Sequence, residues 1–423
     1  MSLCLTDRIE RITSTATGRA CELFRADSDT RAANLRAAVA GRRVLVVGGA
    51  GSIGSASVLE LLALDPAALA VLDPAENNLA ELIRTVRAEP VPFAGDFSVE
   101  PLDYGSPLAA SWLAAQAPFD LVLSFAALKH VRSERDAWSV LRLLEVNLLK
   151  ADRFLAALRR HGHGRGGVFF VSTDKAANPV SLMGASKRAM ELLLWAHRQP
   201  GTPASLIDGG EAPPLARAST TRFANVAFSD GSLPWAFLQR IEKRQPLAAP
   251  ADVRRWLVSP REAGRLCLLA ALVCPDRHVL VPSLAADRHS VTFDRLAEAT
   301  LDDFGYLPAW CASEAEARRR PIPERPGGAW PVLLTKSDTS GEKSEEEFIA
   351  ADERAVDLGL TDVEAIAAPT VDPAALAALL QRLDAAVAAR TPLPAKADLA
   401  VWLATVVPGM HHRETGASLD AKL

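Results

Sequence analysis

Residues 44–54 read VLVVGGAGSIG, an apolar run that ends in a glycine-rich turn. The glycines form a GxxGxxG pattern, and helical periodicity begins near Ser55. Such glycines allow a tight turn, close approach of the backbone to a pyrophosphate, and close packing of helix on strand. The helix N-terminus offers free amide groups to an anion. We therefore expect a dinucleotide to contact this turn through Gly48, Gly51, Ser52, Ile53 and Gly54.

Further apolar runs alternate with longer helical segments along the first half of the chain. They are ALAVLD (68–73), FDLVLSFAA (119–127), GVFFVST (167–173) and TTRFANV (220–226). This alternation is typical of a parallel sheet with helices on both faces. The sequence therefore predicts an α/β fold with a Rossmann-type, doubly wound parallel sheet.

The chain has 423 residues, which exceeds the usual size of a single hydrophobic core. The pattern predicts an N-terminal helical arm (1–40), a dinucleotide-binding domain that carries the catalytic residues (41–230), a mainly substrate-binding or cap region (231–371), and a C-terminal helix and tail (372–423). The segment 199–219, rich in Pro, Gly and Ala, is expected to be a surface loop.

One carboxylate favours NAD as the dinucleotide. Asp73 ends the second apolar run, 19 residues after Gly54, where a carboxylate can accept hydrogen bonds from a ribose diol. The five residues that follow Asp73 are Pro, Ala, Glu, Asn and Asn, and they supply no cation for the 2′-phosphate of NADP. We expect NAD rather than NADP.

Composition excludes several functional classes. The formal net charge is −4 and 23% of the residues are charged, so no long basic field is present to attract nucleic acid. The five cysteines are scattered without metal-ligand spacing, and we assign no metal. The first residues lack the pattern of a signal peptide and no apolar stretch approaches the length of a membrane span, so we expect a cytoplasmic protein with no membrane partner.

Seven motifs occur in order over most of residues 40–350. They are GGAGSIG (48–54), AALKHV (126–131), STDKAANP (172–179), MGASKR (183–188), TTRFANV (220–226), SDGSLP (229–234) and GEKSEEEF (341–348). On these motifs the chain resembles the extended short-chain dehydrogenases, and within them the polysaccharide-biosynthesis branch that contains the UDP-N-acetylglucosamine 4,6-dehydratases.

The resemblance implies roles for several residues around the cofactor. Lys187 would hydrogen-bond the nicotinamide ribose, and its charge would favour deprotonated oxygen nearby. Asp103 would approach the adenine, and Asn147 would support an active-site water or the lysine geometry. Cofactor contacts are also expected from Ala126, Ala127 and Lys129, and Lys129 and His130 are expected to contact substrate.

The same resemblance implies the chemistry. A dehydratase oxidises C4, so that the ketone acidifies the C5 proton and the C6 hydroxyl can leave. Asp174 would be the acid that protonates the departing oxygen, Lys175 the base that removes the C5 proton, and Thr173 a hydrogen-bond partner of the C4 oxygen. Without the resemblance, an Asp-Lys pair is more often a solvated ion pair than a catalytic dyad.

The chain departs from the short-chain dehydrogenase pattern YxxxK at one position. Met183 stands where the tyrosine is expected, and a thioether cannot act as an acid or base. Some long-form members of this dehydratase branch also carry methionine there. Our hypothesis is that Asp174 or Lys175, directly or through water, accepts the C4 proton.

For the substrate, the resemblance places Asn225, Ser232 and Arg255 near a UDP group, with Arg255 on the diphosphate. Glu342 and Lys343 match a distal GEK motif that closes the nucleotide pocket. A homo-oligomer, formed through the helices that flank residues 136–160 and 180–198, is implied as well.

Three functions remain open at this point. The first is an NAD-dependent 4,6-dehydratase acting on a UDP-sugar, with UDP-N-acetylglucosamine as the expected substrate. A nucleotide-sugar epimerase would share the cofactor residues and the C4 oxidation, but would not require an acid and a base directed at C6 and C5. A sensor or scaffold that binds NAD without chemistry is the third, and Met183 favours it.

Overall fold

The larger part of the molecule is built on one sheet. The computed structural model describes residues 3–129, 134–283, 290–336, 346–390, 392–407 and 409–412. Within these residues, nine strands lie side by side: β14 (Ala355–Asp357), β15 (Val363–Ala367), β10 (His278–Pro282), β6 (Ala218–Thr221), β5 (Gly167–Val171), β4 (Leu121–Ser124), β1 (Arg43–Val47), β2 (Ala68–Leu72) and β3 (Asp96–Glu100). All pairings from β3 to β10 are parallel, whereas β15 and β14 are antiparallel to their neighbours. This confirms the predicted Rossmann-type sheet.

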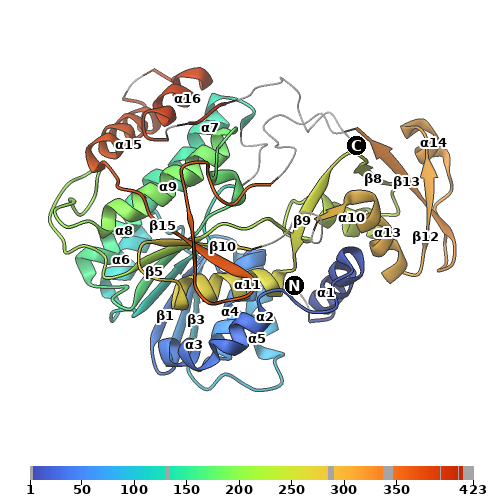
Figure 1. The fold of residues 1–423 in the computed structure, drawn as a ribbon, viewed down its shortest axis with the longest axis horizontal. Helices are drawn as coiled ribbons and strands as arrows, with labels where there is room; N and C mark the ends of the chain where they lie inside the picture. Colours follow the sequence, from blue (N-terminus) through green and yellow to red (C-terminus); the bar gives the residue numbers. More distant parts are fainter. Residues whose placement is uncertain are drawn as a thin grey trace.

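Helices cover both faces of this sheet (Figure 1). Alternate residues of β1 point to opposite faces, so that Val44 and Val46 belong to one core and Leu45 and Val47 to the other. On the first face lie α3 (Ala32–Val39), α4 (Ser52–Leu62), α5 (Glu76–Arg87) and α11 (Pro260–Leu268), which η4 (Leu269–Val273) extends. On the second face lie α6 (Pro107–Ala115), α7 (Ala137–Leu144), η2 (Glu145–Leu149), α8 (Lys150–His161) and α9 (Leu182–Arg198).

A second layer of helices covers the second face. α15 (Pro373–Val387) and α16 (Lys396–Ala404) pack against α7 and α9, and leucines such as Leu380 and Leu399 join the same core. As a result α9 is buried from Leu182 to His197. The sequence predicts one C-terminal helix where the structure has two, and it predicts a contact between subunits on this face. In the structure the chain itself covers these helices, and oligomerisation stays a prediction.

The smaller lobe is built on two short sheets (Figure 1). One contains β11 (Ser290–Thr292), β9 (Arg254–Val258) and β7 (Asn225–Val226), and the other β12 (Leu307–Cys311), β13 (Ala329–Thr335) and β8 (Leu247–Pro250). The lobe also contains α1 (Leu3–Thr17), α10 (Leu233–Glu242), α13 (Phe293–Asp303) and α14 (Glu314–Arg319). Its main core centres on Phe237 and Trp330.

The predicted region 231–371 is therefore divided between the two lobes. β10, β14 and β15 complete the large sheet, and α11 packs on α4. The physical reason is the apolar strand β10, which is buried almost throughout and pairs with β6. The predicted strand 220–226 is likewise two strands, because β6 ends before the buried Arg222.

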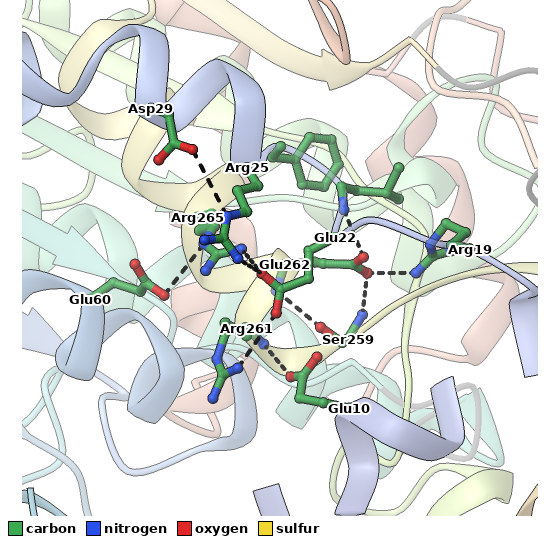
Figure 2. A network of polar contacts seen from close by, with 12 residues as sticks. Glu10, Arg19, Glu22, Arg25, Asp29, Glu60, Ser259, Arg261, Glu262 and Arg265 are labelled. Atoms are coloured by element: carbon green, nitrogen blue, oxygen red, sulfur yellow. Dashed lines mark hydrogen bonds and ion pairs between the residues drawn. The ribbon is translucent and has the colours of Figure 1, made fainter. Parts of the chain in front are cut away.

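The N-terminal arm connects the two lobes. Ile9 and Ile12 of α1 lie in the core of the smaller lobe, whereas α2 (Arg25–Thr30) and α3 lie on the larger lobe. Figure 2 shows the charged network at the crossing, in which Glu262 is central. The carboxylate of Glu262 accepts hydrogen bonds from Arg19 Nη2 (2.7 Å), Leu23 N (2.8 Å) and Ser259 N (2.8 Å). One buried side chain thus both caps α11 and fixes the arm.

We expect Glu262→Ala to destabilise the protein by about 3 kcal/mol, because the change leaves the largely buried Arg19 guanidinium without its carboxylate. Urea unfolding followed by circular dichroism measures the free energy of unfolding. Glu81→Ala is the matched control, since Glu81 pairs with an exposed arginine and its loss should cost less than about 0.5 kcal/mol. Equal effects of the two changes would show that the network does not hold the arm.

The segment 199–219, expected to be a surface loop, runs into β6 at Ala218, and buried polar groups anchor the part before this strand. Asp152, which is fully buried, accepts hydrogen bonds from Ser205 Oγ (2.6 Å) and Leu206 N (3.0 Å), and contacts His197 Nε2 at 2.9 Å. Arg159 donates to four backbone carbonyls of the segment. The Ser-His-Asp combination is no hydrolytic triad, because the serine bonds the aspartate rather than the histidine.

Candidate functional site

The glycine turn joins β1 to α4, and the three glycines of the GxxGxxG pattern differ in how closely other atoms surround them. Gly48 has φ +70°, and a Cβ there would lie 2.6 Å from the backbone nitrogen of Ala126. A Cβ on Gly54 would lie 2.2 Å from Gly48 O. Gly51 differs, because its φ is −77° and a Cβ there would lie 3.6 Å from its nearest neighbour. The fold therefore requires glycine at positions 48 and 54, whereas nothing in the fold itself requires glycine at position 51.

Asp73 follows the end of β2, at the same edge of the sheet as the glycine turn. Its carboxylate accepts hydrogen bonds from Ala50 N (3.2 Å) and Ala75 N (2.9 Å). Burial raises the pKa of Asp73, and the two backbone amides only partly offset this effect. The carboxylate therefore lies beside the turn that precedes α4, and its contact with a ribose stays a prediction.

The remaining residues around the turn come from separate loops. Ser52 is the first residue of α4, three residues earlier than expected, and its hydroxyl accepts a hydrogen bond from Asp230 N (3.0 Å). Ile53 packs on the core of the first face. After β4, Ala126 and Ala127 are partly buried and Lys129 is exposed. The hydrogen bond between Ser52 and Asp230 places the loop 229–231 close to the start of α4.

Asp103 and Asn147 are held by contacts within the protein. Asp103 follows β3 and forms an ion pair with Lys150 of α8. Asn147 is buried in η2, and its side chain accepts from Leu128 N (2.9 Å) and donates to Leu128 O (3.0 Å). It also donates to Ser186 Oγ (2.9 Å), next to Lys187. Asn147 thus ties the loop after β4 to the helix that carries the lysine.

Lys187 and Met183 lie one turn apart on α9. The Nζ of Lys187 donates to Val171 O, at the end of β5, and burial lowers the pKa of Lys187 to about 8. Met183 is buried in the first turn, and its backbone nitrogen donates to Glu134 Oε1 (2.9 Å). The helix therefore presents its lysine at the strand end, and the thioether at the tyrosine position is enclosed.

Thr173, Asp174 and Lys175 follow β5, where η3 (Asp174–Ala176) begins. Thr173 Oγ1 donates to Asp174 Oδ1 (2.7 Å), and Lys175 Nζ lies 3.3 Å from both carboxylate oxygens. The Asp174 side chain is 6% exposed and that of Lys175 27%, so the pair is not a fully solvated surface pair. Burial by itself would lower the pKa of Lys175, but the carboxylates of Asp174 and Glu346 outweigh burial and raise it. Lys175 is thereby held as an ammonium group.

Glu346 is a site residue that the sequence reasoning missed. Its carboxylate accepts hydrogen bonds from Asn225 Nδ2 and from Trp256 N (2.7 Å), and lies 4.0 Å from Arg255 Nε. Burial and the carboxylate of Asp174 raise the pKa of Glu346 to about 7. The neighbouring strands β7 and β9 thus bring Asn225 and Arg255 together around this carboxylate.

A buried ion network holds the segment that carries Glu346. Arg222, fully buried, donates to both carboxylate oxygens of Glu191 and of Glu353, and also to Phe348 O (2.9 Å). Glu191 in turn accepts from Ser172 Oγ (2.6 Å), directly before Thr173. The segment 346–353 and the end of β5 are therefore fixed to the same arginine.

The remaining predicted substrate contacts involve Ser232, which the structure describes, and three residues that it does not. Ser232 is the N-cap of α10, and its hydroxyl accepts from Trp235 N (3.3 Å). His130 and Glu342, together with Lys343 of the same motif, lie outside the described residues. Their proposed contacts with substrate stay predictions.

The geometry can be compared with known proteins. The family model described as "Polysaccharide biosynthesis protein" matches residues 44–353. The chain belongs to this family. The match covers the parallel strands of the large sheet, the glycine turn and the Asp174-Lys175 pair, and it ends before β14. It confirms the resemblance to the polysaccharide-biosynthesis branch of the extended short-chain dehydrogenases.

Several relatives share parts of the chain. An uncharacterized membrane protein of Methanocaldococcus jannaschii is 28% identical over 63% of this chain and 74% of its own. The capsular polysaccharide biosynthesis protein CapD of Staphylococcus aureus is 28% identical over 57% of this chain, which spans only 37% of CapD. A UDP-N-acetylglucosamine 4,6-dehydratase (inverting) of Campylobacter jejuni is 31% identical over 34% of this chain and 40% of its own.

Solved structures share the fold. Pen from Bacillus thuringiensis superposes with a TM-score of 0.60 at 19% identity, over 78% of this chain and 89% of that one. A UDP-N-acetylglucosamine 4-epimerase from Methanobrevibacter ruminantium superposes with a TM-score of 0.52 at 16% identity, over 84% of this chain and 100% of that one. These similarities extend to the fold alone.

Among the described residues, none of the helices has the length and apolar character needed to cross a membrane.

Proposed function

We propose that the protein is an NAD-dependent nucleotide-sugar 4,6-dehydratase that acts on UDP-N-acetylglucosamine. The observation that carries this proposal is the Asp174-Lys175 pair, which Thr173 contacts and which begins three residues after Val171, the residue whose carbonyl accepts from Lys187. An epimerase needs no second acid and base beyond those at C4. The partial identity to a UDP-N-acetylglucosamine 4,6-dehydratase supports the same substrate.

The residues at the glycine turn fit NAD. Gly51 is a glycine that the fold itself does not require, and a pyrophosphate at the N-terminus of α4 would require it. Asp73 would accept hydrogen bonds from the adenosine ribose, and Lys187 would donate a hydrogen bond to the nicotinamide ribose. NAD, when bound, supplies the hydride acceptor for C4 and the hydride donor for C6.

The charge states of the pair favour a particular division of labour. The sequence-based assignment made Lys175 the base at C5, but its raised pKa keeps the amine protonated. We infer that the Asp174 carboxylate accepts the C5 proton, and that the Lys175 ammonium group donates to the departing C6 oxygen. The protons and charges of the elimination then balance. The C5 proton goes to the Asp174 carboxylate, and the C6 hydroxyl leaves as water with a proton from Lys175.

The proposal is tested by incubating the protein with NAD and UDP-N-acetylglucosamine. Mass spectrometry should show the loss of one water, and borodeuteride should trap a new keto group. An unchanged mass with an altered sugar on chromatography would instead identify an epimerase. Bound NAD without any change in the sugar nucleotide, for UDP-N-acetylglucosamine and related UDP-sugars, would support the sensor or scaffold that Met183 favours.

A glycine substitution tests the cofactor site separately. We expect Gly51→Ala to keep the thermal stability of the wild type, because its Cβ would meet no atom closer than 3.6 Å. NAD affinity, measured by calorimetry, should fall by about tenfold or more as the methyl group meets the pyrophosphate. Gly48→Ala is the contrasting variant, and it should lower stability even without NAD, because of its positive φ. Unchanged NAD affinity in Gly51→Ala would contradict the assignment.

A further inference from the structure

Glu346 is the feature of the site that the proposed function does not yet use. Its side chain is 6% exposed, and it faces Asp174 and Lys175 from η3 and Arg255 from β9. A buried carboxylate needs donors, and here they come from Asn225 and the backbone of Trp256. Asn225 and Arg255 are also the residues expected to hold the UDP group.

The position of Glu346 is built into the fold. Phe348, two residues further on, packs against Trp256 with ring centroids 4.8 Å apart and an interplanar angle of 38°, and its carbonyl accepts from Arg222. Glu353 fixes the other end of the segment through Arg222 and Arg188. The segment therefore places the Glu346 carboxylate beside Arg255 by buried contacts at several points.

We propose that Glu346 is a third proton-handling side chain of this site, and that it binds a proton when the diphosphate of a sugar nucleotide takes its place on Arg255 and Asn225. This inference rests on the proposed function. Two anions cannot share one arginine without cost, because each disfavours the charge of the other. When the diphosphate approaches Arg255, the Glu346 carboxylate keeps Lys175 but shares its second cation, Arg255, and gains a negative neighbour, and both changes favour its neutral form.

The neutral form also suits the chemistry. With Glu346 protonated, Asp174 is the remaining carboxylate beside Lys175, and the pair keeps one base and one acid. The pKa of Glu346, about 7 in the unliganded protein, places this protonation within the physiological range. Sugar-nucleotide binding thereby sets the charge of the site.

Calorimetry of UDP binding in buffers of different ionisation enthalpy measures the protons taken up. The wild type and Glu346→Gln are compared with NAD present, so that ionisation of UDP itself cancels in the difference. We expect the wild type to take up on the order of half a proton more per UDP near pH 7 than Glu346→Gln. Glu347→Gln is the matched control, because Glu347 accepts from Asn178 instead (3.1 Å), and it should behave as the wild type.

The outcomes separate the two proposals. Equal proton uptake by all three proteins overturns the role of Glu346 and leaves the dehydratase untouched. Failure of UDP to bind any of them removes the proposed substrate class, and the role of Glu346 with it. If Glu346→Gln does not fold, the wild type alone gives a second check. Its proton uptake should disappear below about pH 5, because the carboxyl group of Glu346 already carries its proton there. Proton uptake that persists below this pH contradicts the inference.

Discussion

Asp174→Asn should abolish exchange of the C5 proton with solvent, whereas Lys175→Met should retain that exchange and lose the elimination of water. Asp174 is nearly buried, and its oxygens lie 3.3 Å from Lys175 Nζ. An amide cannot accept the proton, and a thioether cannot donate one. Loss of one positioned acid or base typically lowers the rate by about 10² to 10⁴.

Deuterium incorporation at C5 of the recovered sugar nucleotide, followed by mass spectrometry in deuterated water, gives the first readout, and the loss of one water from the sugar gives the second. The reverse pattern, with exchange lost only in Lys175→Met, would restore the assignment made from sequence. Stopped-flow absorbance of Asp174→Asn tests the C4 proton as well, since normal hydride transfer would show that the aspartate does not accept it. Both variants should bind NAD like the wild type, because neither residue lies at the glycine turn.

Glu191→Ala should destabilise the protein by about 3 to 5 kcal/mol, because it leaves two guanidinium groups buried beside a vacated carboxylate position. Glu191 is fully buried and pairs with Arg222 at 2.7 Å and Arg188 at 2.9 Å. This loss is a large share of a typical free energy of unfolding, which is about 5 to 15 kcal/mol. Urea unfolding measures it, with Glu81→Ala again as the exposed control; a loss below about 1 kcal/mol would contradict the prediction.

The pH dependence gives an independent test of the same network. Burial raises the pKa of a carboxyl group, but Arg222 outweighs burial here and holds the pKa of Glu191 at about 2, below its usual 4.5. A lowered pKa contributes stability that is present above the unfolded-state value and is lost as the pH falls through the folded-state value. The wild type should therefore lose stability between about pH 4.5 and 2, and Glu191→Gln should lose less over this range.

The central strands could be predicted because they are buried on both faces and read as unbroken apolar runs. β3 could not, because DFSVE forms an edge strand that is only half-buried and carries charges at both ends. β10 is buried and apolar, but it follows residues that resemble a cap region, and its place beside β6 depends on tertiary pairing. Sequence order alone does not reveal such a return to the sheet.

The candidate site was predictable where a motif follows a strand. Asp73 follows β2 directly, Asp174 and Lys175 follow the end of β5 within four residues, and parallel strands bring their ends to one edge. Glu346 was missed because SEEEF resembles a solvated charged run. The signal that could have revealed it is the apolar pair Phe348-Ile349, which indicates that the segment turns inward. The protonation state of Lys175 could not be predicted, since its raised pKa depends on Asp174 and also on Glu346, a carboxylate 171 residues away in the sequence.

The crossing of the N-terminal arm has a consequence for synthesis of the chain. α1 packs on α13, and Arg19, just after α1, pairs with Glu262, so the start of the arm finds its partners about 240 to 290 residues later. At about 5 to 20 residues per second, the ribosome needs on the order of 10 to 60 s to make them. During that interval the sheet strands β1 to β5 can pair as they emerge, while the apolar face of α1 has no native site. Packing of the N-terminal arm on the smaller lobe should therefore be a late event in folding. Until the smaller lobe has formed, the apolar face of α1 is exposed to non-native contacts.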